Sequence, residues 1–384
     1  MRVRLFLHKP PQNPMTDPRI EQIATVLTRY SLNIQSGETL YIQADAAAEP
    51  LLREVYRQGI RAGAFVTTQI SLPGLGKIFM DEANEDQLKW INPFYQMAIE
   101  QFDAYLSIGA PTNTREGSGC DPEKRAIKQT AIQPIFDTLL KRFADGAFKW
   151  CATQFPTQAA AQDANMEFED YEQFVFNAYL PDRENPIGFW QDMETRQNRL
   201  IERLKAVKEI RLLASDTDLT VNVDGRTWIN CAGRENFPDG EVFTCPVEDK
   251  TEGHVSFTYP AVHMGNEVIG AQLFFENGRI VRATAEKGDD FLIQMLDSDE
   301  GACVLGEFAI GTNPGIQTFT RNTLFDEKIQ GTVHMAVGMS YPESGGKNQS
   351  QIHWDMVCDM REGGQLFADG ELIYENGAFT IDFE

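Results

Sequence analysis

Basic residues are scarce in this sequence of 384 residues. Lys and Arg together number 34 against 57 Asp and Glu, which gives a formal net charge of -23 and a pI near 4.6. Binding to a polyanion without regard to sequence requires Lys and Arg to neutralise phosphates. The composition therefore argues against nucleic acid and anionic membranes as partners. The acidic excess predicts a well-solvated surface, and leaves open an acidic cavity that attracts cations.

Cysteines and long apolar runs are also few. The six cysteines include no Cys-x-x-Cys pair, so a zinc knuckle and a thioredoxin-like motif are excluded, and a reduced, cytoplasmic protein is expected. No apolar run approaches the ~18 residues of a membrane span, and the first residues lack the apolar core of a signal peptide. We expect residues 1–14 to be a disordered arm.

A phosphate-binding loop is missing as well. The segment Ser71 to Lys77 (SLPGLGK) resembles part of a Walker A motif, but its first Gly is absent and Ile78 follows in place of Ser or Thr. No G-x-G-x-x-G follows a strand-like run. The first part of the chain is therefore interpreted as a scaffold without a nucleotide site.

Residues 15–214 alternate between helical and strand-like patterns. Strands are expected at 39–44, 64–70, 105–108, 150–153 and 210–213, with helices at 51–62, 122–143 and 194–207 among those between them. Strands separated by helices require crossover connections and a mainly parallel sheet. An open α/β domain is predicted for this part of the chain.

The pattern changes in residues 215–384, where short alternating runs are punctuated by tight turns. Asp224-Gly225, Asn277-Gly278, Asp369-Gly370 and Asn376-Gly377 have the residue types of hairpin turns, and a helix is expected near 289–296. We predict a second, mixed α+β domain rich in antiparallel strands, with the boundary near residue 214.

The segment 331–358 (GTVHMAVGMSYPESGGKNQSQIHWDMVC) contains candidate metal ligands. His334 and His353 are two of only five histidines, and Asp355 follows His353 by two positions. In a strand, residues two apart point to the same face, so His353 and Asp355 would converge while Trp354 packs in the core. Tyr341 lies in a Gly- and Pro-containing stretch that could aim its phenol into a cavity, and Glu343 is a further carboxylate nearby.

Two glutamates upstream share a local pattern. Glu241 (DGEVFTCPVED) and Glu307 (LGEFAIGTNPGI) each follow a Gly and precede an apolar residue, so the backbone can be approached closely while a strand directs the carboxylate. Oxygen ligands with a few imidazoles suit zinc, cobalt or manganese, and paired ions commonly share a bridging carboxylate. Taken singly, the two histidines could be hydrogen-bonded core residues, the tyrosine an ordinary buried tyrosine, and the glutamates surface carboxylates.

These three motifs together resemble the aminopeptidase T, AmpS and PepS group of metallopeptidases, and the resemblance extends from Met15 over nearly the whole chain. The resemblance implies a homodimer whose active sites face an internal cavity. It also implies two divalent metal ions per chain, with no ligand position substituted. The implied ligands are Glu241, Glu307, His334, Tyr341, His353 and Asp355.

The resulting hypothesis is a metal-dependent aminopeptidase that acts on peptides through a metal-activated water at a dinuclear site. Glu307 or Glu343 would be the general base, and Tyr341 would bind metal, stabilise the oxyanion, or do both. The alternatives are another metal-dependent amidohydrolase or dipeptidase, a Cys-His hydrolase with Cys245 as nucleophile, and a non-catalytic peptide-binding protein on the same scaffold.

Overall fold

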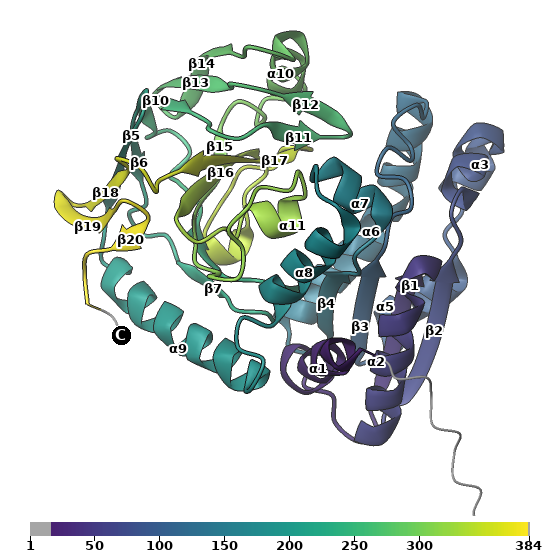
Figure 1. The fold of residues 1–384 in the computed structure, drawn as a ribbon. Helices are drawn as coiled ribbons and strands as arrows, with labels where there is room; N and C mark the ends of the chain where they lie inside the picture. The colour runs from purple at the N-terminus through teal and green to yellow at the C-terminus, as the bar shows by residue number, and fades with distance from the viewer. Residues whose placement is uncertain (1–16, 383–384) are drawn as a thin grey trace, which may run out of the picture.

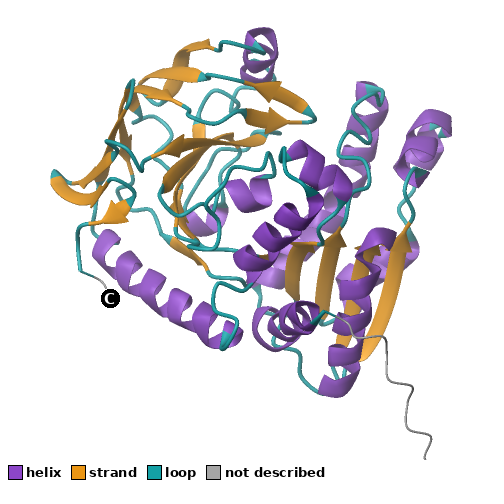
Figure 2. Cartoon of the chain, in the orientation of Figure 1, coloured by secondary structure: helices purple, strands orange, loops and turns teal. Residues whose placement is uncertain are grey.

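The computed structural model describes residues 17–382, which form two halves built on different sheets (Figure 1). The predicted arm at residues 1–14 lies outside the described residues. The first half contains a parallel sheet covered by helices, and the second half contains antiparallel sheets (Figure 2). This arrangement confirms the predicted fold class. No helix in residues 17–382 combines the length and apolarity needed to cross a membrane.

The parallel sheet has the strand order β2-β1-β3-β4-β8, and every pairing in it is parallel. Alternate side chains of its strands reach opposite faces. Leu106 of β3 and Cys151 of β4 belong to the large core of the first half, whereas Tyr105 and Trp150 pack against a second, smaller core. Both faces are therefore buried, as expected for a sheet whose crossovers are helices. Its strands are β1 (Thr39–Asp45), β2 (Phe65–Ser71), β3 (Ala104–Gly109), β4 (Lys149–Gln154) and β8 (Asn236–Phe237).

The helices of the first half follow the predicted crossovers. The helix expected at 122–143 is α6, and the one expected at 194–207 starts earlier, at Pro186 after an Asn185 cap, and ends at Leu204. They are α1 (Pro18–Val26, extended by a π-helical turn, Leu27–Ser31), α2 (Glu49–Ala62), α3 (Leu75–Glu82), α4 (Glu85–Lys89), α5 (Pro93–Gln101), α6 (Pro122–Ala144), α7 (Gln158–Asp163), α8 (Phe168–Tyr179) and α9 (Pro186–Leu204).

The second half contains two larger antiparallel sheets. One has the order β14-β13-β10-β6-β5-β18-β19-β20, and the other, called here the ligand sheet, has the order β17-β16-β15-β9-β7. The strands of the first are β5 (Glu209–Ala214), β6 (Thr217–Asn222), β10 (Glu252–Ser256), β13 (Gln272–Glu276), β14 (Arg279–Thr284), β18 (Gln365–Ala368), β19 (Glu371–Glu375) and β20 (Ala378–Phe379). The strands of the ligand sheet are β7 (Ile229–Cys231), β9 (Glu241–Thr244), β15 (Leu305–Gly311), β16 (Thr332–Gly338) and β17 (His353–Asp359).

Smaller elements complete the second half. A two-stranded hairpin, β11 (Ala261–His263) and β12 (Asn266–Val268), packs against β17. Helix α10 (Asp289–Leu296) has the predicted bounds, and the short α11 (Thr323–Asp326) precedes β16. One apolar core joins the inner faces of both larger sheets, with Leu219, Phe308 and Met335 among its fully buried members.

Three of the four predicted turns join hairpins, β13–β14, β18–β19 and β19–β20. In the first, Asn277 and Gly278 both have positive φ, 51° and 79°, as a type I′ turn requires. The fourth turn, Asp224-Gly225, is different because β6 and β7 before and after it belong to different sheets. The prediction of a hairpin at this position was wrong.

The sequence pattern also assigned the strand predicted at 210–213 to the wrong sheet. It is β5, which pairs antiparallel with β6 and β18 instead of joining the parallel sheet. The connection from β5 to β6 is a tight turn at Asp216 (φ 49°), so the two strands are necessarily antiparallel neighbours. The domain boundary near 214 stays a prediction: the strands from β5 onward lie outside the parallel sheet, except β8, which joins it.

Candidate metal centre

The predicted donors lie on one face of the ligand sheet, and its register explains why. Glu307 is opposite Ala336, which in turn is opposite Asp355, and residues directly opposite each other share a face. His334 is likewise opposite Ala309, His353 opposite Gly338, and Glu241 opposite Gly311. Small residues therefore alternate with the donors, which leaves space above the sheet for ions.

The other face of the same strands is apolar. Phe308, Met335, Trp354 and Met356 alternate with the donors and are at most 1% exposed in the core of the second half. Trp354 therefore packs in the core, as predicted, between His353 and Asp355. The packed face fixes the strands, so the donor side chains start from a rigid support.

The glycines before Glu241 and Glu307 are required by close backbone contacts. A Cβ at Gly306 would lie 2.1 Å from the Met339 carbonyl oxygen, and one at Gly240 would lie 2.8 Å from Cβ of Asn313. The pairing of β15 with β16 shifts at Gly306, which is the position of a β-bulge. A bulge changes the direction of the next side chain, so Gly306 sets the direction of Glu307.

Glu307 occupies the middle of the cluster. Its Oε1 lies 3.5 Å from Nε2 of His334, and its Oε2 lies 3.2 Å from Nε2 of His353. His334 Nε2 is also 3.2 Å from Oε2 of Glu241, and His353 Nε2 is 3.5 Å from Oδ1 of Asp355. The donors thus form two groups that share Glu307, one with Glu241 and His334 and one with His353 and Asp355.

Several of these buried atoms have no hydrogen-bond partner within residues 17–382. They are Glu241 Oε2, both ring nitrogens of His334, and Asp355 Oδ1. Buried polar atoms are rarely left unpaired, so a cluster of them indicates a missing ligand. His353 differs because its Nδ1 lies 2.8 Å from the Met339 carbonyl oxygen, which holds the ring with Nε2 toward Glu307. The donor set therefore fits divalent metal ions.

Burial and mutual charge dominate the electrostatics of the cluster. Burial opposes the charged form of His334, but the carboxylates of Glu241 and Glu307 raise its pKa well above the usual range. Burial likewise opposes ionisation of Asp355, but His353 lowers its pKa to about 2. Without ions, the carboxylates thus favour protonated imidazoles, whose positive charge balances theirs. A bound metal cation would supply that positive charge instead.

After β16, Tyr341 precedes a short 3₁₀ turn, Pro342–Ser344, which contains Glu343. The Tyr341 ring packs edge-on against the His353 ring, with 5.1 Å between centroids, and against Phe243. Burial, followed by the charge of Glu307, raises the pKa of Tyr341 well above its usual value. Glu343 lies on the exposed surface of the turn, outside the two donor groups. The structure therefore brings Tyr341 to the cluster and leaves Glu343 outside it.

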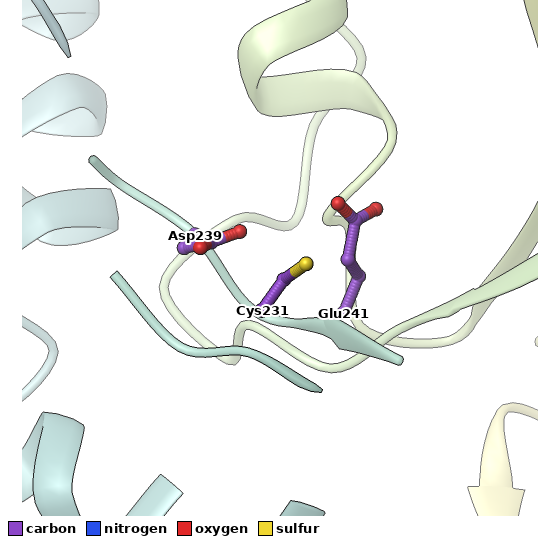
Figure 3. A group of neighbouring side chains, drawn as sticks. All are labelled: Cys231, Asp239 and Glu241. Carbon is purple, nitrogen blue, oxygen red and sulfur yellow. The ribbon is translucent and has the colours of Figure 1, made fainter. Parts of the chain in front are cut away.

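Four residues beside the cluster were not singled out from the sequence. A carboxylate oxygen of Glu327 lies within 4.8 Å of ligand atoms of His334 and Asp355, and Cys231, Asp239 and Glu241 form another such group (Figure 3). Lys328 is completely buried between these residues. Asp239 lies in the DGEVFTCPVED motif, which could have drawn attention to it. Glu327 and Lys328 follow a short helix and carry no recognisable pattern.

The chain is similar to proteins that are named aminopeptidases. The sequence is 29% identical to Aminopeptidase 2 of Geobacillus stearothermophilus, covering 95% of this chain and 98% of the relative. It is 28% identical to Aminopeptidase T of Thermus thermophilus, covering 94% and 96%. The solved structure of wild-type AmpT from Thermus thermophilus shares the fold, with a TM-score of 0.83 and 24% identity over 95% of this chain and 99% of that chain.

These similarities confirm the resemblance to the aminopeptidase T, AmpS and PepS group. The family described as thermophilic metalloprotease (M29) matches residues 16–379, which include every donor described above. The chain belongs to the thermophilic metalloprotease (M29) family.

Proposed function

We propose that the protein is an aminopeptidase that releases N-terminal residues from peptides and uses two divalent ions held by the donor cluster. The observation that carries the proposal is the position of Glu307, whose two oxygens face His334 and His353 separately. A carboxylate with one oxygen toward each of two donor groups is the arrangement of a bridging ligand. The relatives named aminopeptidases support the same reaction.

Glu241 and His334 would hold one ion, His353 and Asp355 the other, and Glu307 both, with Tyr341 as an additional oxygen ligand. This mixture of carboxylates and imidazoles suits zinc, cobalt or manganese. When bound, such ions lower the pKa of a coordinated water toward ~7 and polarise a carbonyl oxygen. The site residues then have to orient the peptide and transfer protons.

Glu307 and Glu343 remain the candidates for the general base. Glu307 is 4% exposed and central, so it is the better placed of the two, whereas Glu343 is exposed on its turn. The phenol of Tyr341 is positioned beside His353 and could donate a hydrogen bond to the oxyanion that forms at the scissile carbonyl. One of the ions would also receive the free α-amine of the substrate, which would favour cleavage at the N-terminal residue.

The Cys-His alternative finds little support around Cys245. This thiol is completely buried, and burial raises its pKa. Its sulfur accepts hydrogen bonds from the hydroxyl of Ser344 at 2.6 Å and from the backbone N–H of Tyr341 at 3.3 Å. A cysteine nucleophile needs a lowered pKa and a histidine partner. The pKa of Cys245 is raised, and its hydrogen-bond partners are Ser344 and Tyr341.

The decisive experiment combines elemental analysis with peptide hydrolysis. We expect about two divalent ions per chain, hydrolysis of aminoacyl chromogenic substrates, and loss of activity on chelation that metal addition restores. Peptides with free and acetylated N-termini separate the alternatives, because a general amidohydrolase would accept both. A protein that folds but binds no metal would instead be a peptide-binding protein on the same scaffold.

A homodimer in the cytoplasm is also proposed. β2 is the edge strand of the parallel sheet, and apolar side chains along it and in the following segment are more than half exposed. An apolar sheet edge is normally covered in the native protein. These exposed residues are Phe65, Ile70, Leu72, Leu75 and Ile78.

The six cysteines are all free, in line with a reducing compartment such as the cytoplasm.

A further inference from the structure

Lys328 is a fully buried cation beside the candidate metal centre. Its side chain has no exposed surface, and its Nζ lies 3.4 Å from Oε1 of Glu241 and 3.9 Å from Oδ1 of Asp239. It also donates a hydrogen bond to Oε1 of Glu327. A buried ammonium is costly unless opposite charges surround it, and these three carboxylates supply them.

The backbone holds Lys328 in place on both sides. Its N–H donates to the Phe325 carbonyl at 3.0 Å, and its carbonyl accepts from the N–H of Asn313 at 3.1 Å. The side chain of Asn313 in turn donates to the backbone carbonyls of Asp239 and Ala178. The ammonium is therefore fixed relative to the chain that leads into Glu241.

Glu241 divides its two oxygens between Lys328 and the metal centre. Oε1 faces the ammonium, whereas Oε2 faces His334 and has no hydrogen-bond partner among the residues that the structure describes. A carboxylate held at one oxygen presents the other in a defined direction, as outer partners of metal ligands commonly do. Lys328 thus leaves one oxygen of Glu241 free for an ion.

The group Cys231, Asp239 and Glu241 has the donor types of a metal site (Figure 3). The ammonium of Lys328 nevertheless already lies within 4 Å of both carboxylates. A divalent ion held by the same group would stand next to a like charge in a buried environment, which is strongly unfavourable.

The formal charges agree with this reading. When all are ionised, the five carboxylates around the centre carry five negative charges, which two divalent ions and one ammonium would neutralise. A third divalent ion would leave an excess of buried positive charge. The five carboxylates are Asp239, Glu241, Glu307, Glu327 and Asp355.

We propose that Lys328 is a positioning residue for the metal centre: its ammonium holds Glu241 toward one ion and prevents an additional ion from binding to Cys231 and Asp239. The inference rests on the proposed metal-dependent function, because it assigns Lys328 a role toward ions bound by the neighbouring donors. It concerns binding and does not require Lys328 to touch substrate.

The test is a cobalt titration of the wild-type protein and of Lys328→Met, which removes the charge and keeps an unbranched side chain one atom shorter. Isothermal calorimetry measures affinities and elemental analysis counts ions. We expect two ions in the wild type without a thiolate-to-cobalt charge-transfer band. In Lys328→Met one ion should bind about 10- to 100-fold more weakly, and the thiolate band should appear as an additional ion binds to Cys231 and Asp239.

Matched variants identify the cause. Lys328→Met combined with Cys231→Ser should lose the thiolate band. Lys149→Met removes a lysine that pairs with Glu38 at 2.6 Å in the other half of the molecule, and should bind cobalt like the wild type. Circular dichroism checks that each variant is folded.

The outcomes separate this inference from the proposed function. Wild-type protein that binds two ions, together with folded Lys328→Met of unchanged affinities and no thiolate band, would overturn the role of Lys328 alone. A thiolate band in the wild type would do the same without any variant, and it remains available if Lys328→Met does not fold. Wild-type protein that binds no cobalt would overturn the metal-dependent function itself.

Discussion

Removal of divalent ions should destabilise the second half of the molecule far more than the first. The ion-free cluster holds buried carboxylates, with Glu241 beside His334, Asp355 beside His353, and Glu307 beside both imidazoles. Ions that bind the folded chain and not the unfolded one stabilise the folded state by mass action. Chelation should therefore lower the melting temperature, and added zinc, cobalt or manganese should restore it.

The size of the effect follows from the number of ions. At a free concentration of about 100 times Kd each ion contributes about 2.7 kcal/mol, so two ions contribute about 5 kcal/mol. The entropy of unfolding is about 2.1 cal/mol/K per residue, or about 0.35 kcal/mol/K for a unit the size of residues 215–384. The expected shift is therefore about 15 °C if that part unfolds alone, and about 7 °C if the whole chain unfolds together.

Differential scanning calorimetry of chelated and metal-loaded protein measures this shift. Glu307→Gln should abolish most of it, because the amide cannot replace a carboxylate shared by both donor groups, and peptidase activity should fall by at least about 100-fold. Glu54→Gln is the matched control: Glu54 is 5% exposed and paired with Arg57, but lies in α2 of the other half. Its metal-dependent shift should equal that of the wild type.

If divalent ions do not change the melting temperature of the wild-type protein, the reasoning is refuted. The unpaired buried donors of the cluster would then not be ion ligands. A Glu307→Gln protein with the full shift and full activity would remove Glu307 from the bridging position and from proton transfer.

Three further predictions concern single residues. Gly306→Ala should cost about 1–3 kcal/mol in urea denaturation, because its Cβ would meet the Met339 carbonyl oxygen at 2.1 Å, and should weaken metal binding through Glu307. Hydrogen bonds from the N–H and hydroxyl of Thr39 hold the pKa of Asp103 below its usual value. The ionised carboxylate of Asp103 therefore stabilises the fold above about pH 4, and this contribution is lost as pH falls through the lowered pKa. Asp103→Asn should therefore reduce the loss of stability that acid causes. Cys245→Ala should keep kcat/KM within about threefold, less than 1 kcal/mol, and an inactive but folded, metal-loaded variant would revive the thiol mechanism.

The sequence predicted the regular elements well where a single pattern governs them. The strand expected at 39–44 and the helix at 289–296 agree with β1 and α10 because their periodicity and end signals are local. The strand at 210–213 looks the same in either sheet, so only its tight turn to β6, which depends on the chain that follows, decides its neighbours.

The candidate donors were identified in a different way. His353 and Asp355 are two apart in a strand, and Glu241 and Glu307 follow glycines, so residue type and spacing suggested a metal site, whereas the full set of ligands was implied by the family resemblance. Their convergence depends on the register of four strands, which no local pattern specifies. Lys328 could not be found in this way, because a lysine after a short helix resembles a surface residue until its burial is known.

The two residues of β8 give the first half of the molecule a part in the metal centre. Asn236 and Phe237 pair with Ala152 and Thr153 of the parallel sheet, and the chain reaches Asp239 and Glu241 only a few residues later. The α/β half thereby anchors the segment that leads into the ligand sheet. A C-terminal fragment that starts after this half would have to hold Glu241 without that anchor, so we expect it to bind ions more weakly than the intact chain.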